Sequence, residues 1–340
     1  MHKYWDNFEK RINQTVEAIK NGSKIPPLGR ISLHITSKCM FRCDYCNEFH
    51  NKCILPQPLF YKIIKEYSQM GGGILHITGG EPTTVNWLDS AIQGKPENVT
   101  INLNSNCYKL LKKETYKFID RIKISLDTNN EKYFDYLVHC PGAFNKVIDN
   151  IWKLSEYNKA KDISITYTLT KENYKNIPEF LNWYYKKLPF LYAIFFSVYK
   201  GKNERFLFTE DDQKFFWTHV VPEMKQILVE NKDEESLWLF ENSYNSNTLS
   251  CSCRYPENMK VPCFISKSEL TINEKGNVWR CSHLFRDKIP PSRFFNIENN
   301  SLDYIHENLS QEVYPQCLTG CNLKLVHFNQ EVQRRIKCQK

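Results

Sequence analysis

Near its start the chain reads Ile31-Ser-Leu-His-Ile-Thr-Ser-Lys-Cys39-Met-Phe-Arg-Cys43-Asp-Tyr-Cys46, a segment that joins a strand pattern to three closely spaced thiols. Apolar and polar residues alternate from Ile31 to Thr36, which is the period of a β-strand. Three thiolates on the loop that follows can bind three irons of an iron–sulfur cube and leave the fourth iron open. A zinc ion would need a fourth ligand, which Cys53 or His50 could supply. The spacing therefore indicates a metal-binding loop and leaves cluster and zinc open.

The strand pattern recurs along the chain and alternates with helix patterns. Further strands are predicted at residues 74–78, 99–103, 122–126, 163–169 and 193–198. Between them, apolar residues repeat at helical spacing, as in Phe60, Ile63, Ile64 and Tyr67. Parallel neighbours need a crossover of about a dozen residues or more, usually a helix. The alternation therefore predicts an α/β fold, a partial (β/α)6 barrel, with its chemistry at the C-terminal ends of the strands.

The pattern changes after Gly201. Residues 210–232 are predicted to form a charged amphipathic helix, and residues 242–252 are rich in Asn and Ser. Two short strands, 270–272 and 278–280, flank a turn that contains Gly276 and predict a hairpin. We expect an N-terminal helical segment at residues 1–29, the barrel at 30–232 and a small cysteine-rich domain at 233–340.

Composition excludes several classes of protein. The hydrophobic fraction of 41% and charged fraction of 25% are those of an ordinary globular chain, not a disordered one. The longest apolar run, residues 188–198, is broken by Pro189 and is short of the ~20 residues of a membrane helix. The net charge of +8 is spread along the chain, so we expect neither a membrane nor a nucleic-acid partner. Thirteen cysteines without a secretory signal indicate metal or catalytic thiols in the reducing cytoplasm.

Two motifs together resemble those of the radical S-adenosylmethionine (SAM) enzymes. The first is Cys-x3-Cys-x2-Cys after the first strand, with the aromatic Tyr45 before its last cysteine. The second is Gly79-Gly80-Glu81-Pro82, which follows the second strand. The resemblance implies a [4Fe-4S] cluster on Cys39, Cys43 and Cys46, and SAM with its methionine amino group at the Gly79–Pro82 turn. Two glycines allow a close approach of the backbone, and carboxylate or carbonyl oxygens accept from an ammonium.

The resemblance also implies further SAM contacts at later strand ends. Residues 122–127, Ile-Lys-Ile-Ser-Leu-Asp, resemble the family's fourth strand, which assigns Ser125 to the SAM ribose and adds Asp127 to the site. Asn106, and less closely Asn104, resemble the polar residues that end the third strand, although both asparagines also suit a simple turn. The family's adenine motif on the fifth strand is not recognisable in residues 164–170, so Tyr45 is the expected adenine contact.

The tail resembles the SPASM/twitch extension of the same superfamily. The pattern is Cys263-x12-Gly276-x4-Cys281, followed by Phe295-Asn-Ile297. Only part of the full SPASM cysteine run is present, which favours the shorter twitch form. The resemblance implies one auxiliary [4Fe-4S] cluster on Cys263, Cys281, Cys317 and Cys321. Cys251, Cys253 and Cys338 could substitute or hold a second cluster.

The resemblance implies an oxidoreductase. SAM would be cleaved reductively to a 5′-deoxyadenosyl radical that removes a substrate hydrogen, and the auxiliary cluster would accept the second electron. The donor would be a flavodoxin or ferredoxin. The substrate is expected to be a small polar molecule or a ribosomal peptide; Met1–Arg30 is short for a leader-binding domain, which favours the former. Candidate substrate contacts are Tyr192, Tyr199, Lys200 and Arg205.

A second hypothesis is a non-catalytic iron–sulfur or zinc protein, such as an electron carrier. The Gly79–Pro82 motif counts against this alternative, because an electron carrier needs no methionine-binding turn. Formation of 5′-deoxyadenosine from SAM separates the two hypotheses.

Overall fold

A computed structural model describes residues 3–22, 28–46, 51–157, 162–244, 252–253, 263–286, 288–289, 295–309 and 321–337. The helices are α1 (Lys3–Lys20), α2 (Gln57–Gln69), α3 (Leu88–Gln93), α4 (Glu131–Val138), α5 (Ala143–Tyr157), α6 (Ile177–Lys187), α7 (Glu210–Phe215), α8 (Val221–Glu230), α9 (Glu234–Glu241), α10 (Ser282–Arg286), α11 (Leu302–Asn308) and α13 (Leu323–Lys337). The strands are β1 (Arg30–His34), β2 (Gly73–Thr78), β3 (Val99–Ser105), β4 (Arg121–Ser125), β5 (Asp162–Leu169), β6 (Ala193–Val198), β7 (Ser252–Cys253), β8 (Glu269–Ile272), β9 (Asn277–Trp279), β10 (Phe295–Asn296) and β11 (Cys321–Asn322).

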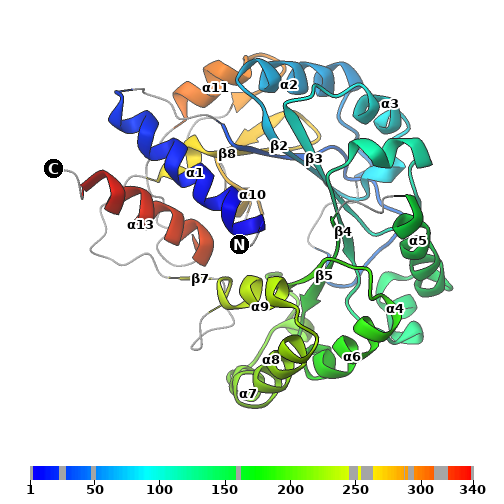
Figure 1. Ribbon diagram of the computed structural model, residues 1–340. Coiled ribbons are helices and arrows are strands. Elements are labelled where there is room, and N and C mark those ends of the chain that lie inside the picture. The colour runs from blue at the N-terminus through cyan, green and yellow to red at the C-terminus, as the bar shows by residue number, and fades with distance from the viewer. Residues whose placement is uncertain are drawn as a thin grey trace.

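The main sheet has the order β10-β9-β8-β1-β2-β3-β4-β5-β6. All neighbours from β8 to β6 are parallel, whereas β9 and β10 are antiparallel to the strands they join. Helices α2 to α6 follow the outer side of this curved sheet (Figure 1). The predicted α/β class, with six strands alternating with helices in a partial barrel, is confirmed.

The strands present two different faces, because successive side chains point to opposite sides of a sheet. One set is apolar and buried in the main core with the helices; it includes Ile31, Leu33, Leu75, Ile77, Ile101, Leu103, Ile122, Ile124, Ile163 and Ile165. The alternate set faces the inside of the partial barrel and is polar; it includes Ser32, His34, His76, Asn102, Asn104, Lys123 and Ser164. The outer face therefore holds the fold together, and the inner face is available for polar recognition.

The predicted helix at residues 210–232 is divided in three. A π-helical turn, Phe216–Val220, separates α7 from α8. Pro222 lies in the first turn of α8 and has no N–H, so it cannot continue the regular hydrogen-bond ladder of the preceding turn. The amphipathic pattern was visible in the sequence, and the proline explains the break.

The C-terminal part extends the barrel sheet. The predicted hairpin is formed by β8 and β9, and its turn contains Gly276 at a φ of +76°. β8 also pairs in parallel with β1, so that Ile31 lies opposite Leu270. A second core joins α1, α13 and the segment around Cys281 through Ile12, Phe328 and Val332, and Figure 1 shows α1 and α13 side by side. The division into domains at residue 232 stays a prediction.

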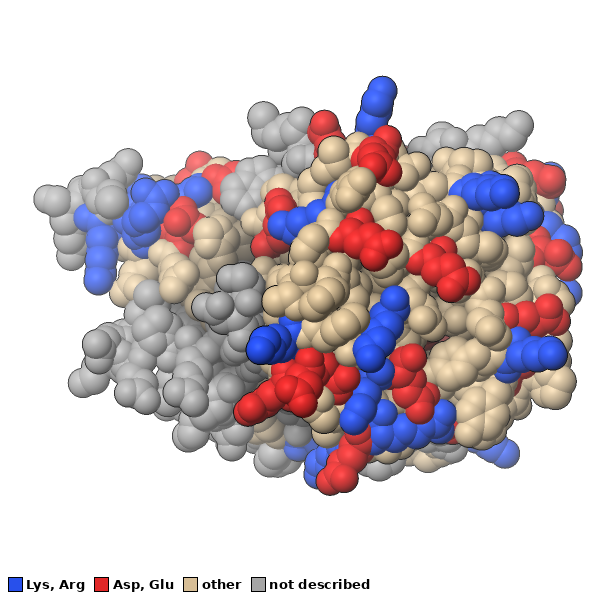
Figure 2. Space-filling view, turned by 90° about the horizontal axis from the view of Figure 1, so that it is seen from below, with Lys and Arg blue, Asp and Glu red and all other residues tan. Residues whose placement is uncertain are grey.

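Two surface properties bear on partners. Positive and negative side chains are interspersed over the face drawn in Figure 2, without a large area of one sign. No helix among the described residues is both long enough and apolar enough to cross a membrane.

Candidate active site

The cysteine loop leaves the C-terminal end of β1 and runs along the end of α4. The amides of Arg42 and Asp44 donate to the carbonyls of Val138 and Leu137, at 3.1 Å each. These bonds satisfy acceptors that the last turn of a helix otherwise leaves open. The loop that carries Cys39, Cys43 and Cys46 is therefore held by its backbone at the edge where the strands end.

The cysteine loop supplies the type of donor that an iron–sulfur cluster uses, three thiols on one short segment. Cys39 Sγ accepts from the Phe41 amide at 3.4 Å and from Asn106 Nδ2 at 3.6 Å. Burial raises the pKa of Cys39 to about 11, and burial together with the neighbouring Cys46 also raises that of Cys43. Three thiolates on one short loop would need a cationic centre, which a cluster would supply. Over the described ranges, which omit His50, no three or more His, Cys, Asp or Glu side chains are arranged to hold a metal ion.

The Gly79–Pro82 turn packs directly on the backbone of the cysteine loop. Gly80 donates to the Thr36 carbonyl at 2.6 Å, and the Glu81 amide donates to the Lys38 carbonyl at 2.8 Å. A Cβ on Gly79 would lie 2.2 Å from the Thr36 oxygen, and one on Gly80 would lie 2.4 Å from the Lys38 oxygen. Gly79 also has a φ of +134°, which favours glycine. Both glycines are needed for this close approach of two backbone segments.

Glu81 is fully buried and binds the protein itself. Its Oε1 accepts from the Thr83 amide and hydroxyl and from Ser105 Oγ at 2.8–3.0 Å, and its Oε2 accepts from the Asn106 amide at 2.6 Å. Burial raises the pKa of this carboxyl, and these hydrogen bonds oppose the shift. The expected direct contact with a methionine ammonium is therefore replaced by a positioning role, in which the carboxylate joins the turn to the end of β3.

Asn106 connects the third strand to the cysteine loop. Its Nδ2 lies 3.6 Å from Cys39 Sγ and 3.3 Å from Met40 Sδ, while its Oδ1 accepts from the Tyr108 amide at 3.0 Å. The structure thus brings Asn106 to the predicted cluster site. Asn104 lies two residues earlier and its buried Oδ1 has no hydrogen-bond partner.

Asp127, Tyr45 and Ser125 meet where β4 ends. Asp127 is 1% exposed; its Oδ2 accepts from the Tyr45 hydroxyl and its Oδ1 from the Thr168 amide at 2.5 Å. Burial raises the pKa of Asp127 to about 6. Ser125 is exposed and open to a ligand. Asp127 therefore orients Tyr45 and the end of β5, and of the predicted SAM contacts here Ser125 is exposed and Tyr45 is half-buried.

Sequence reasoning missed Asn173, which holds the same strand ends. Its Nδ2 donates to the carbonyls of Thr168 and Asp127, at 2.8 and 3.1 Å, and its Oδ1 accepts from the Thr170 amide at 2.8 Å. A polar residue directly after a strand was the only available signal, and it also fits an ordinary turn.

Arg205 is bound by carboxylates. Its Nη1 donates to Asp44 Oδ2 at 2.8 Å, and its Nε donates to Glu172 Oε1 at 2.6 Å. His139 Nε2 also contacts Asp44. Burial alone would raise the pKa of Asp44, but the hydrogen bonds from His139 and Arg205 outweigh burial and lower this pKa. Asp44 lies between two predicted cluster ligands. The expected substrate contact by Arg205 thus gives way to a contact that holds the cysteine loop.

We predict that Arg205→Gln loosens the cysteine loop more than it destabilises the protein. Partly exposed ion pairs contribute roughly 0.2–1 kcal/mol to global stability, but here the pairs fix one loop. Hydrogen exchange of the Arg42 and Asp44 amides should accelerate, while the melting temperature changes little. Arg334→Gln, which removes an exposed pair with Glu331 on α13, is the matched control. Equal exchange rates at this loop in both variants would contradict the role of Arg205.

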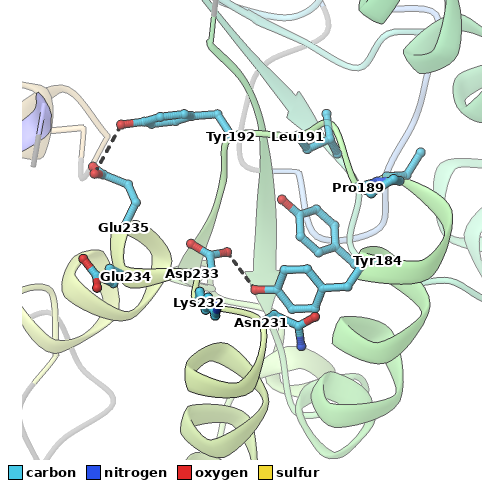
Figure 3. A pocket seen from close by; sticks show the side chains of 11 residues that line it. Tyr184, Pro189, Leu191, Tyr192, Asn231, Lys232, Asp233, Glu234 and Glu235 are labelled. Atoms are coloured by element: carbon cyan, nitrogen blue, oxygen red, sulfur yellow. Dashed lines mark hydrogen bonds between the residues drawn. The ribbon is translucent and has the colours of Figure 1, made fainter.

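A pocket of about 420 Å³ lies away from this edge, at the N-terminal end of β6 (Figure 3). Its lining includes tyrosines and carboxylates, and Tyr185 and Tyr192 donate to Asp233 and Glu235 at 2.7 and 3.2 Å. Tyr192, expected near the substrate, therefore lines a separate pocket. Tyr199 is buried and its hydroxyl accepts from the Asn203 amide at 3.2 Å.

The tail cysteines are described only in part. Cys281 is buried and Cys263 packs against the same small core. Asn329 Nδ2 lies 3.9 Å from Cys263 Sγ and its Oδ1 accepts from the Phe264 amide at 2.8 Å. In the backbone, Cys321 pairs with Cys253 across the β11–β7 ladder. Cys317, Cys251 and Cys338 lie outside the described residues.

Comparison with known proteins agrees with this geometry. The family model described as the radical SAM superfamily matches residues 33–184. GTP 3′,8-cyclase of Clostridium perfringens (strain SM101) is 32% identical over 179 residues, 49% of this chain and 54% of that protein. GTP 3′,8-cyclase of Psychromonas ingrahamii is 26% identical over 238 residues, 66% of each chain. The chain spans about half the length of the first curated relatives it matches.

Solved structures share the fold over most of the chain. Streptococcus suis SuiB bound to the precursor peptide SuiA has a TM-score of 0.61 and 16% identity, covering 86% of this chain and 67% of SuiB. Native anSMEcpe with bound AdoMet and the Cp18Cys peptide has a TM-score of 0.63 and 17% identity, covering 92% of this chain and 98% of anSMEcpe. Its motifs, its sheet and the family match together identify residues 33–184 as a radical SAM domain.

Proposed function

We propose that this radical SAM enzyme is an oxidoreductase of the cytoplasm. Cys39, Cys43 and Cys46 would hold a [4Fe-4S] cluster, which when reduced and bound to SAM supplies a 5′-deoxyadenosyl radical for hydrogen abstraction. One observation carries the proposal: the Gly79–Pro82 turn is packed on the cysteine loop through Gly80 and Glu81. This packing supports the proposal, because the backbone that would bind the methionine lies next to the loop that would carry the open iron.

The chain's own residues would bind and orient SAM. Glu81 is saturated by protein donors, so the backbone carbonyls of Gly79 and Gly80 are the acceptors we assign to the methionine ammonium. Asn106 would hold Cys39 and the methionine end, and Ser125 would meet the ribose. Tyr45, fixed through its hydroxyl by Asp127, would present its ring to the adenine. Phe206 packs edge-to-face on Tyr45 and supports that ring.

The tail would hold the auxiliary [4Fe-4S] cluster. Its ligands would be Cys263, Cys281, Cys317 and Cys321. Cys253 is the alternative ligand that we favour, because its backbone pairs with that of Cys321. Four thiolates leave no open iron, so the role assigned is to accept one electron from the substrate radical. With the hydrogen atom taken by the adenosyl radical and a proton released, the substrate loses two electrons. A flavodoxin or ferredoxin would reduce the SAM-binding cluster.

Anaerobic incubation with SAM and dithionite tests the proposal. Formation of 5′-deoxyadenosine and methionine by the reconstituted protein supports an enzyme. Its absence in protein with a fully assembled cluster would favour a non-catalytic iron–sulfur carrier, and zinc in place of iron would favour a zinc protein. The sequence relatives are named GTP 3′,8-cyclase, and this name suggests a second candidate function, a reaction without net oxidation of the substrate. A product at the same oxidation level as its substrate would support that alternative.

We predict that a Cys281→Ala, Cys321→Ala double variant separates the two clusters. Iron should fall from about eight to about four atoms per chain, whereas 5′-deoxyadenosine formation should persist, because SAM binds at the other cluster. Iron analysis and chromatography of the quenched reaction measure these quantities. Cys140→Ala, an isolated partly buried thiol, is the control. Unchanged iron content, or loss of SAM cleavage, would contradict an auxiliary cluster at these cysteines.

A further inference from the structure

The inner face of the barrel sheet carries buried polar atoms that lack protein partners. Among the described residues these include Asn104 Oδ1 on β3, Ser164 Oγ on β5, Thr271 Oγ1 on β8 and Arg30 Nε on β1. Ser164 and Thr271 are 0% and 1% exposed. Buried polar groups are almost always hydrogen-bonded, and leaving one without a partner costs free energy. Their common location on one face indicates a polar occupant.

Three of the inner residues form a row across neighbouring strands. Asn104 lies opposite Lys123 in the β3–β4 register, and Lys123 lies opposite Ser164 in the β4–β5 register. Lys123 precedes Ser125 by two residues, a separation of about 7 Å along a strand. The row therefore lies one side-chain layer beneath the strand ends that carry the SAM-facing groups.

The charge of this face is positive. Strand alternation places three cationic residues on this face, Arg30, Arg121 and Lys123. The same face carries two carboxylates, those of Asp162 and Glu269. Arg121 pairs with Asp162 at 2.9 Å, and Glu269 is already paired with Arg11 of α1 at 3.5 Å.

Two further observations describe the surroundings of these cations. Lys123 Nζ lies 3.7 Å from the centroid of the Phe195 ring, which holds the ammonium at the inner face. Burial first, and then Arg30 and Lys123, hold the pKa of His76 well below its ordinary value, so this imidazole is neutral and adds no charge.

We propose that the Asn104–Lys123–Ser164 row binds the substrate through an anionic group, a phosphate or a carboxylate, on a small polyhydroxylated molecule. Lys123 provides the charge, Ser164 a hydroxyl donor, and Asn104 Oδ1 an acceptor for a substrate hydroxyl. The inference rests on the proposed function, because it places this substrate beneath the SAM site. It favours a small molecule over a ribosomal peptide. The pocket of Figure 3 is lined by three carboxylates, Asp233, Glu234 and Glu235, against one lysine, Lys232, so it suits such an anion less well.

The test uses anaerobic holoenzyme and three matched probes: D-ribose 5-phosphate, D-gluconate and neutral D-ribose. Calorimetry should detect one or both anions, with ribose weaker by about tenfold or more. The phosphate and carboxylate probes identify which anion is preferred. Lys123→Gln should weaken anion binding by a similar factor, and Lys123→Arg should retain most of it. Lys132→Gln, an exposed lysine on α4, is the control and should change nothing.

A parallel assay separates this inference from the proposed function. Substrate-free SAM cleavage to 5′-deoxyadenosine should stay within about twofold in Lys123→Gln, because Lys123 lies below the strand ends. Equal binding of ribose and the anions, no binding of either anion, or loss of binding in Lys132→Gln but not in Lys123→Gln would overturn the inference. A wild-type holoenzyme that binds the anion but never cleaves SAM would instead overturn the proposed function.

Discussion

Replacing Cys39, Cys43 and Cys46 together with alanine is expected to abolish SAM cleavage and leave the protein folded. The three thiols lie on a loop whose backbone is held by α4 and by the Gly79–Pro82 turn, so their removal takes away the cluster and not the support. Bound iron should fall from about eight to about four atoms, the remainder belonging to the tail. Iron analysis, 5′-deoxyadenosine measurement and circular dichroism give the three readouts.

Cys53→Ala is the matched control for this triple variant. Cys53 lies next to the loop, its carbonyl accepts from the Thr36 hydroxyl at 2.8 Å, and it was the candidate fourth ligand of a zinc site. Its variant should keep the cluster and SAM cleavage. Zinc lost from Cys53→Ala, or 5′-deoxyadenosine still formed by the triple variant, would refute the cluster assignment.

Gly80→Ala is expected to displace the cysteine loop and to weaken SAM binding by about tenfold or more, as loss of one hydrogen bond to a charged group does. The added Cβ would lie 2.4 Å from the Lys38 carbonyl oxygen, and this neighbour is backbone that cannot rotate away. Overpacking of this kind costs about 1–3 kcal/mol of stability. Thermal unfolding and SAM titration of the reconstituted protein measure the two effects.

Gly94→Ala provides the comparison, because the same methyl group is added where there is room. Its nearest heavy atom would be 3.5 Å away, and Gly94 has a φ of −91° that any residue can adopt. This variant should keep its melting temperature and its SAM affinity. Equal behaviour of the two alanine variants would mean that the Gly79–Pro82 turn does not support the loop.

Local patterns were sufficient for the central architecture. Apolar residues alternate with a period of two around Ile31 and recur at helical spacing in Phe60, Ile63 and Ile64, because one face of each segment is buried. Such a pattern can be recognised within each segment without knowledge of its neighbours. The same is true of the turn at Gly276, where a positive φ requires glycine. The six strands of the barrel and the C-terminal hairpin therefore agree with the sequence-based prediction.

Roles that depend on distant partners were not visible. Glu81 was expected to face SAM, but Ser105 and Asn106 from another strand occupy its oxygens. Arg205 was expected at the substrate, but Asp44 and Glu172 bind it. In both cases the residue type indicated a polar contact, but the sequence did not reveal the partner. The contacts join segments that are far apart in the sequence and that only the folded sheet brings together.

The pairing of β8 with β1 has a consequence for the order in which the protein can be completed. β1 is the first strand of the barrel to be made, yet its second neighbour, Glu269–Ile272, emerges from the ribosome only after the whole barrel sequence. Until then β1 is an open edge of the nascent sheet, next to the cysteine loop that we propose binds iron. The final hairpin closes that edge, so the strand that supports the cysteine loop is enclosed on both sides only after the barrel sequence has been made.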